Sequence, residues 1–304
     1  MDRASTGILG RSAFAVVLAV GAWAAPAQTA LAVGFTIRTV AVMGEQMPGV
    51  DPGVTLAFVG GGGEADVAIN ASGQVFFDGT VAGPTVDGWT NQAAFAEGPG
   101  GLALAFWEGN QAAGTPPGVL LHCPSSTSFN NMGQALIFSG LVGVELGGGL
   151  DNNGAWLGPP GGLALLARDG EPAPGTPASV NFFRGFQAPL LNNTGQAAYM
   201  GCLTGPGIVS QVNDHGIWLG SPGNLQLVAR MGDPAPGTAP GVIFSQLFFT
   251  GELRLNSAGE ALFAGQLSGP GIDASNDCGI WGGRRATCNS ECEAACRPRE
   301  PWRA

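Results

Sequence analysis

The chain has 304 residues, of which 45% are hydrophobic and only 11% charged, with 52 Gly and 22 Pro. Ordinary globular chains carry about 25% charged residues, and a chain with this much apolar surface to bury is not a disordered one. The formal net charge of −10, with Arg as the only basic residue type, disfavours binding to nucleic acid or anionic membranes. Abundant Gly and Pro between short apolar runs favour tight turns and an all-β fold.

Residues 1–32 have the pattern of a secretory signal peptide. Arg3 and Arg11 precede an apolar run over residues 13–25, and Ala-x-Ala sites follow that end at Ala27 and Ala32. This order is typical of a signal peptide, and the run is shorter than the ~20 residues of a membrane span. We expect a secreted, periplasmic or cell-surface protein whose mature chain has no membrane span. A buried helix of the mature domain is the alternative.

Three landmarks recur four times, in one order, within a predicted repeat domain over residues 33–283. They are a strand running into a Pro/Gly segment such as RDGEPAPGT (168–176) or RMGDPAPGT (230–238), an Asn-x-x-Gly turn, and a strand with an aromatic residue. Successive copies lie about 62 residues apart, which marks a repeat architecture. The matched residues are Gly44, Gly109, Gly170 and Gly232; Asn70, Gly73, Asn130, Gly133, Asn192, Gly195, Asn256 and Gly259; and Phe95, Trp156, Trp218 and Trp281.

Each unit predicts four β-strands, which in the last unit cover residues 216–220, 225–231, 244–255 and 260–269. We expect the Pro/Gly segment to link the second strand to the third, because proline fixes the backbone without a ladder hydrogen bond and glycine turns it. We expect the Asn-x-x-Gly turn to link the third strand to the fourth, because Asn caps a type I turn and Gly supplies a left-handed residue.

Four-stranded antiparallel units repeated radially predict a β-propeller-like architecture with four blades. A strand over residues 35–44 could pair with the strand of Trp281, which would close the ring and remove an open sheet edge. A shortened fragment of a larger propeller and a stacked β-sheet repeat are the alternatives. The Cys/Arg-rich tail over residues 284–304 is expected to be poorly ordered.

Two segments, LVARMGDPAPGT (227–238) and NDHGIWLG (213–220), resemble a family of exported bacterial tandem-repeat proteins of the choice-of-anchor type. These proteins are marked by Asn-x-x-Gly-x-x-Ala-Phe repeats, and the resemblance covers residues 35–283. It implies an exported repeat domain and no chemistry, because the family has no established activity. The chain departs from the family pattern because no apolar span followed by basic residues precedes its end.

The sequence offers few residues for a metal site. The two histidines, His122 and His215, occupy different slots of the repeat and lack metal-ligand spacing, so we expect ordinary loop or strand residues. Asp and Asn oxygens near the aromatic strand could bind Ca²⁺, although turn formation is the interpretation that we favour. The calcium candidates are Asp87, Asp151, Asp214 and Asp277. Calcium is the only cofactor hypothesised, and no catalytic or cofactor-binding residue is predicted.

The repeated aromatic residue could stack on sugars, but we favour packing between blades, because a repeated core needs an aromatic at one slot. The cysteines Cys123, Cys202 and Cys278 occupy different slots and form no repeated disulfide framework. Export favours disulfides for the three cysteines of the tail, with one hypothesis tying the tail to Cys278. Connectivity does not follow from sequence.

The favoured functional hypothesis is an exported non-enzymatic repeat protein with a binding or structural role at the cell envelope or outside the cell. Its partner would be an extracellular protein or glycan. The alternatives are a secreted propeller enzyme that acts on carbohydrate, with Glu64, Asp66 and Glu145 converging on one face, and a lectin-like module.

Overall fold

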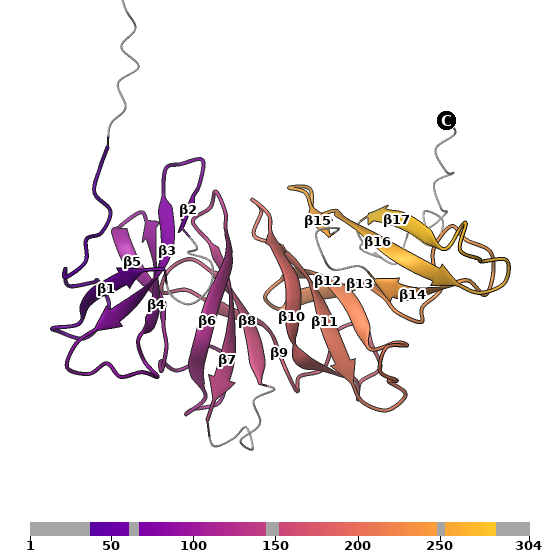
Figure 1. Ribbon diagram of the computed structural model, residues 1–304, viewed down its shortest axis with the longest axis horizontal. Coiled ribbons are helices and arrows are strands. Elements are labelled where there is room, and N and C mark those ends of the chain that lie inside the picture. The colour runs from indigo at the N-terminus through magenta and orange to yellow at the C-terminus, as the bar shows by residue number, and fades with distance from the viewer. Residues whose placement is uncertain (1–36, 61–66, 144–151, 248–252, 284–304) are drawn as a thin grey trace, which may run out of the picture. The chain divides into compact units, whose positions relative to one another are not determined.

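The computed structural model describes residues 37–60, 67–143, 152–247 and 253–283 (Figure 1). Residues 37 and 38 belong to a compact unit Met1–Arg38, and the others to a unit Thr39–Ala304. Within the described ranges the chain forms 17 β-strands in four antiparallel sheets and no helix, so the all-β prediction is confirmed. None of these residues forms a helix that could cross a membrane. The signal-peptide region and the tail lie outside the described residues.

The first sheet has the order β1-β3-β4-β5, with β2 also paired to β3. Its strands are β1 (Thr55–Val59), β2 (Val67–Ile69), β3 (Val75–Ala82), β4 (Gln92–Gly98) and β5 (Gly101–Trp107). β4 carries Phe95, the aromatic residue of the first repeat.

The second and third sheets are four-stranded, with strands adjacent in sequence also adjacent in the sheet. The second sheet consists of β6 (Leu120–Phe129), β7 (Ala135–Val142), β8 (Asn153–Gly158) and β9 (Ala164–Arg168). The third consists of β10 (Asn181–Leu191), β11 (Ala197–Thr204), β12 (His215–Ser221) and β13 (Asn224–Arg230).

The fourth sheet is built around β16, which pairs with β14 and β15 along one edge and with β17 along the other. Its strands are β14 (Ile243–Leu247), β15 (Arg254–Leu255), β16 (Ala261–Ser268) and β17 (Cys278–Gly283). β17 carries Trp281.

The Pro/Gly segments connect consecutive sheets, which corrects the prediction that they join two strands of one blade. β13 pairs with β12, whereas β14, after the segment, pairs with β16 of the next sheet. In this segment Gly232 donates its N–H to the carbonyl of Phe244 (2.8 Å), and Phe244 donates back to that of Asp233 (3.1 Å). Pro234 has no N–H with which to extend the ladder of β13. The third sheet therefore ends at the Pro/Gly segment, where the fourth begins.

Ring closure is not observed in the described part of the chain. Residues 37–44 of the predicted closing strand form no strand, and among the described residues β17 pairs only with β16. Gly44 donates its N–H to the carbonyl of Leu56 in β1 (2.7 Å), in the same way that Gly232 bonds to Phe244. The segment around Gly44 therefore leads into the first sheet as the other Pro/Gly segments lead into theirs.

Three of the four hydrophobic clusters combine residues of consecutive sheets, so the core lies between sheets. Representative pairs are Phe106 with Ile137 for the first and second sheets, Leu136 with Phe182 for the second and third, and Met200 with Phe244 for the third and fourth. The fourth cluster lies on the first sheet, where Met47 and Val54 pack against residues such as Leu56.

The repeated aromatic slot belongs to this core. Phe95, Trp156 and Trp218 are at most 1% exposed, whereas Trp281 of the fourth sheet is partly exposed. Each indole N–H also donates to a carbonyl in the Pro/Gly segment that precedes its own sheet. The acceptors are Ala113 for Trp156 (2.8 Å), Pro174 for Trp218 (2.9 Å) and Pro236 for Trp281 (3.1 Å). The tryptophan therefore fastens its sheet to the segment that leads into it.

The repeated asparagines lie in the turns that lead into β3, β7, β11 and β16, one in each sheet. In the second sheet Asn130 Oδ1 accepts the N–H groups of Met132 (3.0 Å) and Gln134 (2.9 Å), and its Nδ2 donates to Gln134 Oε1 (2.9 Å). Gly133 has a φ of +72°, which favours glycine at this position. The other three turns repeat the same contacts.

These asparagines also connect the repeats. Asn70 Nδ2 donates to the backbone carbonyl of Asn130 (3.0 Å), Asn130 Nδ2 to that of Asn192 (2.9 Å), and Asn192 Nδ2 to that of Asn256 (2.9 Å). We call this series the asparagine ladder. Asn70, Asn130 and Asn192 are buried, whereas Asn256 is exposed and donates only to Glu260 (2.9 Å) among the described residues.

The outer face of the fourth sheet is exposed apolar surface. Leu262 and Ile280 are 46% and 72% exposed. The corresponding residues of the third sheet, Ala198 and Ile217, are fully buried in the cluster shared with the fourth sheet. No described residue covers the outer face in this way.

Candidate functional site

A buried carboxylate follows the last strand of the first sheet and reaches the first strand of the second. Glu108 comes directly after β5 and is 3% exposed. Its Oε1 accepts the N–H of Cys123 in β6 (2.8 Å), and its Oε2 lies 3.4 Å from the N–H of Gln92 in β4. The carboxylate therefore bridges β4 and β6 of two different sheets.

The next repeat builds the same bridge with Asp169, which follows β9 and is also buried. Asp169 Oδ2 accepts the backbone N–H and the side-chain amide of Asn153 (both 2.9 Å), and the N–H of Gly185 in β10 lies 3.1 Å from both carboxylate oxygens. Two of the four repeats thus place a buried carboxylate at this position, between two sheets, whereas Met43 and Met231 occupy it in the other two.

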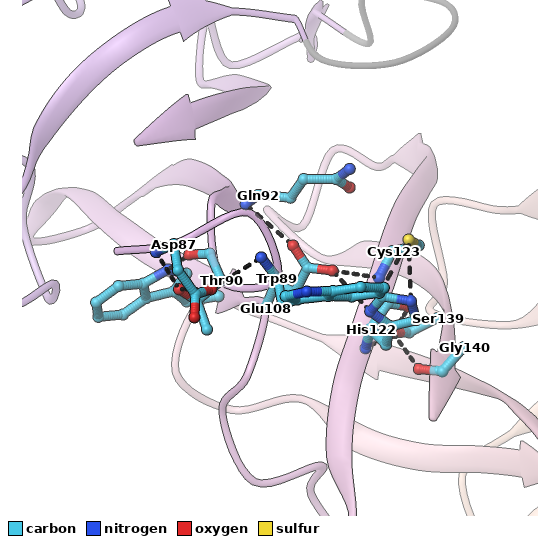
Figure 2. Close-up of polar contacts among 10 residues, drawn as sticks. Asp87, Trp89, Thr90, Gln92, Glu108, His122, Cys123, Ser139 and Gly140 are labelled. Atoms are coloured by element: carbon cyan, nitrogen blue, oxygen red, sulfur yellow. Dashed lines mark hydrogen bonds and ion pairs between the residues drawn. The ribbon is translucent and has the colours of Figure 1, made fainter. Parts of the chain in front are cut away.

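In the first bridge, an imidazole and a thiol stand beside the carboxylate (Figure 2). His122 Nδ1 lies 2.9 Å from Glu108 Oε1, and Cys123 Sγ lies 3.4 Å from His122 Nε2 and 3.9 Å from Nδ1. Consecutive side chains of a regular strand point to opposite faces. Here the register shifts between His122 and Ser125, and Cys123 has a φ of +45°. This bulge brings the two neighbouring side chains together.

The surroundings leave this group open on one side. The ring of Trp89, itself 70% exposed, lies 5.4 Å from that of His122 between centroids. Cys123 lines a cavity of about 230 Å³ together with Ser139, Asn153 and Arg184. Burial and the nearby negative charge of Glu108 raise the pKa of the Cys123 thiol.

A second thiol, imidazole and carboxylate meet in the third sheet. Cys202 of β11 and His215 of β12 are direct cross-strand partners, and such side chains lie about 5 Å apart at Cβ. Cys202 Sγ is 3.4 Å from His215 Nε2, and Asp214 Oδ1 is 2.7 Å from His215 Nδ1.

Hydrogen bonds change the pKa values of the histidine and of the aspartate in this second group. Hydrogen bonds with Cys202 and then Asp214 raise the pKa of His215 to about 9, against the lowering effect of burial. Burial by itself raises the pKa of Asp214, but hydrogen bonds from the Gln211 backbone and from His215 outweigh this effect and lower the pKa.

Both histidines of the chain thus lie between a cysteine and a carboxylate, which the sequence did not predict. His122 and Cys123 are neighbours in sequence, as are Asp214 and His215, so these two pairs were a local signal for a polar group at each histidine. The bulge at Cys123 and the register that pairs Cys202 with His215 were not visible in the sequence.

Among the described residues, the structure does not bring the calcium candidates Asp87, Asp214 and Asp277 together. Asp87 Oδ1 accepts the N–H of Trp89 (2.8 Å) and the hydroxyl of Thr90 (3.0 Å) within its own loop (Figure 2). Asp214 contacts His215, and Asp277 Oδ2 accepts the amide of Gln266 (2.7 Å) in the fourth sheet. Calcium binding stays a prediction. Asp151 lies outside the described residues, as do Glu64, Asp66, Glu145 and the cysteines Cys288, Cys292 and Cys296.

Comparison with known proteins places the chain in a family without assigning it chemistry. No curated protein matches the sequence. The family of unknown function DUF7453 matches residues 9–288, which is most of the chain. Because the match covers more than half of the chain, this chain belongs to the DUF7453 family.

Proposed function

We propose that this chain is an exported, non-enzymatic repeat protein with a binding or structural role at the cell envelope or outside the cell. The observation that carries the proposal is the use of the repeated polar side chains. The asparagines bond to the next repeat, and the tryptophan N–H groups bond to the segments between sheets. The side chains that recur from repeat to repeat therefore serve contact between repeats, and such a repeat is suited to build an extended scaffold.

Export is supported by the signal-peptide pattern of residues 1–32 and by the resemblance to exported choice-of-anchor proteins. The acidic net charge of −10 favours an extracellular protein or glycan partner over nucleic acid. The test is expression of the whole chain in a bacterial host, followed by cell fractionation and mass spectrometry of the N-terminus. We expect a mature chain that starts at Gln28 or Val33 outside the cytoplasm. An intact N-terminus in the cytoplasm would overturn export.

The non-enzymatic role is tested on the purified mature chain. It is incubated with isolated cell envelopes and with a glycan array, and the carbohydrates are then analysed by mass spectrometry. We expect retention on one of these surfaces without cleavage of the carbohydrate. Cleavage would favour the carbohydrate-active enzyme instead, and loss of retention on every surface would contradict a binding role.

For the arrangement of the repeats, the neighbouring-strand order of the second and third sheets supports blades of a propeller-like architecture. The cores between consecutive sheets are compatible with an open stack as well. Small-angle X-ray scattering of the mature chain separates the two, because a closed ring has a smaller radius of gyration than an open stack of the same length.

A further inference from the structure

We propose that Glu108, His122 and Cys123 form a binding site for a divalent transition-metal ion of the zinc class. One ligand atom from each residue lies within 4.8 Å of the others. No other three His, Cys, Asp or Glu residues in the described parts of the chain gather this closely. Carboxylate oxygen, imidazole nitrogen and thiolate sulfur are the three ligand types that bind Zn²⁺ in proteins.

The distances are close to those that a shared ion requires. A tetrahedral zinc site with Zn–N and Zn–O of about 2.0 to 2.2 Å and Zn–S of about 2.3 Å holds N and O about 3.4 Å apart and N and S about 3.6 Å apart. His122 Nδ1 is 2.9 Å from Glu108 Oε1 and 3.9 Å from Cys123 Sγ. Both separations are within about half an ångström of those values. The sulfur lies nearer to Nε2 (3.4 Å) than to Nδ1, so the exposed thiol has to rotate toward Nδ1 in order to share an ion with Glu108.

The position of the carboxylate is set before any ion binds. Glu108 is held in the bridge between sheets by the N–H of Cys123, and Asp169 holds the same place in the next repeat. In that repeat, Phe183 and Arg184 occupy the positions that correspond to His122 and Cys123, so no imidazole or thiol accompanies the carboxylate. The site therefore adds two side chains to a carboxylate bridge that the next repeat also has.

The fourth coordination position faces solvent. Catalytic zinc sites bind three protein ligands and leave one position for water or substrate. Of the three ligands, only Cys123 lines the cavity, together with Ser139, Asn153 and Arg184, so water would reach the ion from the side of the thiol. In the second group, Cys202 and Asp214 contact opposite nitrogens of the His215 ring. Their ligand atoms do not gather as closely as those of Glu108, His122 and Cys123, so we assign no ion to that group.

The test is titration of the reduced, full-length chain with Co²⁺, which gives a thiolate-to-cobalt charge-transfer band when a cysteine is a ligand. Cys288, Cys292 and Cys296 are replaced by Ser in every sample, so that the tail cannot contribute a thiolate. We expect one equivalent of Co²⁺ and a band that disappears in Cys123→Ser and in His122→Gln. Glu108→Gln is expected to weaken binding by at least about ten-fold.

The matched control is Cys202→Ser, which removes a thiol that is equally close to a histidine and should leave the band unchanged. Zn²⁺ should displace Co²⁺ and abolish the band. Circular dichroism checks that each variant is folded. Cys123 is exposed, so we expect Cys123→Ser to fold, and this variant decides the test even if Glu108→Gln does not fold. Absence of the band in the parent chain, or its persistence in Cys123→Ser, would overturn the proposal.

Discussion

Replacing Asn130 by Ala tests whether the asparagine ladder stabilises the fold. The substitution removes the Oδ1 acceptor from the N–H groups of Met132 and Gln134, and the Nδ2 donor from the carbonyl of Asn192. Asn130 is 3% exposed, so water cannot easily replace these partners. With about 1 kcal/mol for each backbone group that loses its partner, we expect the free energy of unfolding to fall by about 3 kcal/mol.

The control is Asn256→Ala, which removes the same two turn hydrogen bonds, to Ala258 and Glu260. Asn256 is exposed and donates to no following repeat in the described structure. Water can therefore solvate the turn, and we expect a loss of about 0.5 to 1 kcal/mol, as for an exposed capping residue. The difference between the two variants therefore measures the bond between repeats together with the burial of the turn at Asn130.

The assay is guanidinium unfolding followed by tryptophan fluorescence and by circular dichroism. Coincident transitions with an unchanged slope would justify a two-state free energy. A third variant, Asn130→Asp, keeps an acceptor for the turn but turns an oxygen toward the carbonyl of Asn192. It should cost more than Ala at neutral pH, because it leaves a buried charge beside an acceptor. Equal losses in Asn130→Ala and Asn256→Ala would refute the ladder as a source of stability.

Three further outcomes follow from the packing and titration of the third sheet. The buried hydroxyl of Tyr199 has no hydrogen-bond partner in the described structure, and Phe263 fills the corresponding slot of the fourth sheet. Because Tyr199→Phe removes this unpaired polar group, it should leave the free energy of unfolding unchanged or raise it by up to about 1 kcal/mol, as measured by thermal unfolding. A Cβ at Gly216 would lie 2.7 Å from the ring of Trp218, so Gly216→Ala should lower the unfolding free energy by about 1 to 3 kcal/mol, and a neutral effect would contradict this packing. The pKa of His215 is raised from 6.5 to about 9, so its protonation stabilises the fold fully below pH 6.5 and the contribution disappears as the pH rises through about 9; the stability advantage over His215→Asn should decline across that window, and an NMR pKa at or below 6.5 would show the sign to be wrong.

The turns of this fold could be predicted from sequence because their determinants are local. Asn256 and Gly259 lie within four consecutive residues, and the φ of +75° at Gly259 is what the motif requires. The cap by Asn Oδ1 followed from the residue type. The bond from Nδ2 to the next repeat did not, because it depends on how two sheets pack.

The sheet boundaries and the candidate metal site could not be predicted because they depend on pairing. The four strands of a unit carry the same pattern whichever neighbours they choose, and only the hydrogen bonds around Gly232 show that β14 starts a new sheet. The site depends on the bulge at Cys123, where the alternation assumed for a strand fails. Cys202 and His215 are 13 residues apart and meet through cross-strand register.

The asparagine ladder gives the array a direction and sets the smallest unit by which it can change length. Each side-chain amide donates toward the C-terminal repeat, over separations of 60, 62 and 64 residues. Duplication or loss of one whole repeat would leave every donor facing an acceptor. Duplication of part of a repeat would strand a buried amide or carbonyl on each side of the junction, which is costly. Evolution of such chains should therefore proceed in whole repeats, and a repeat added after Asn256 would find its donor already in place.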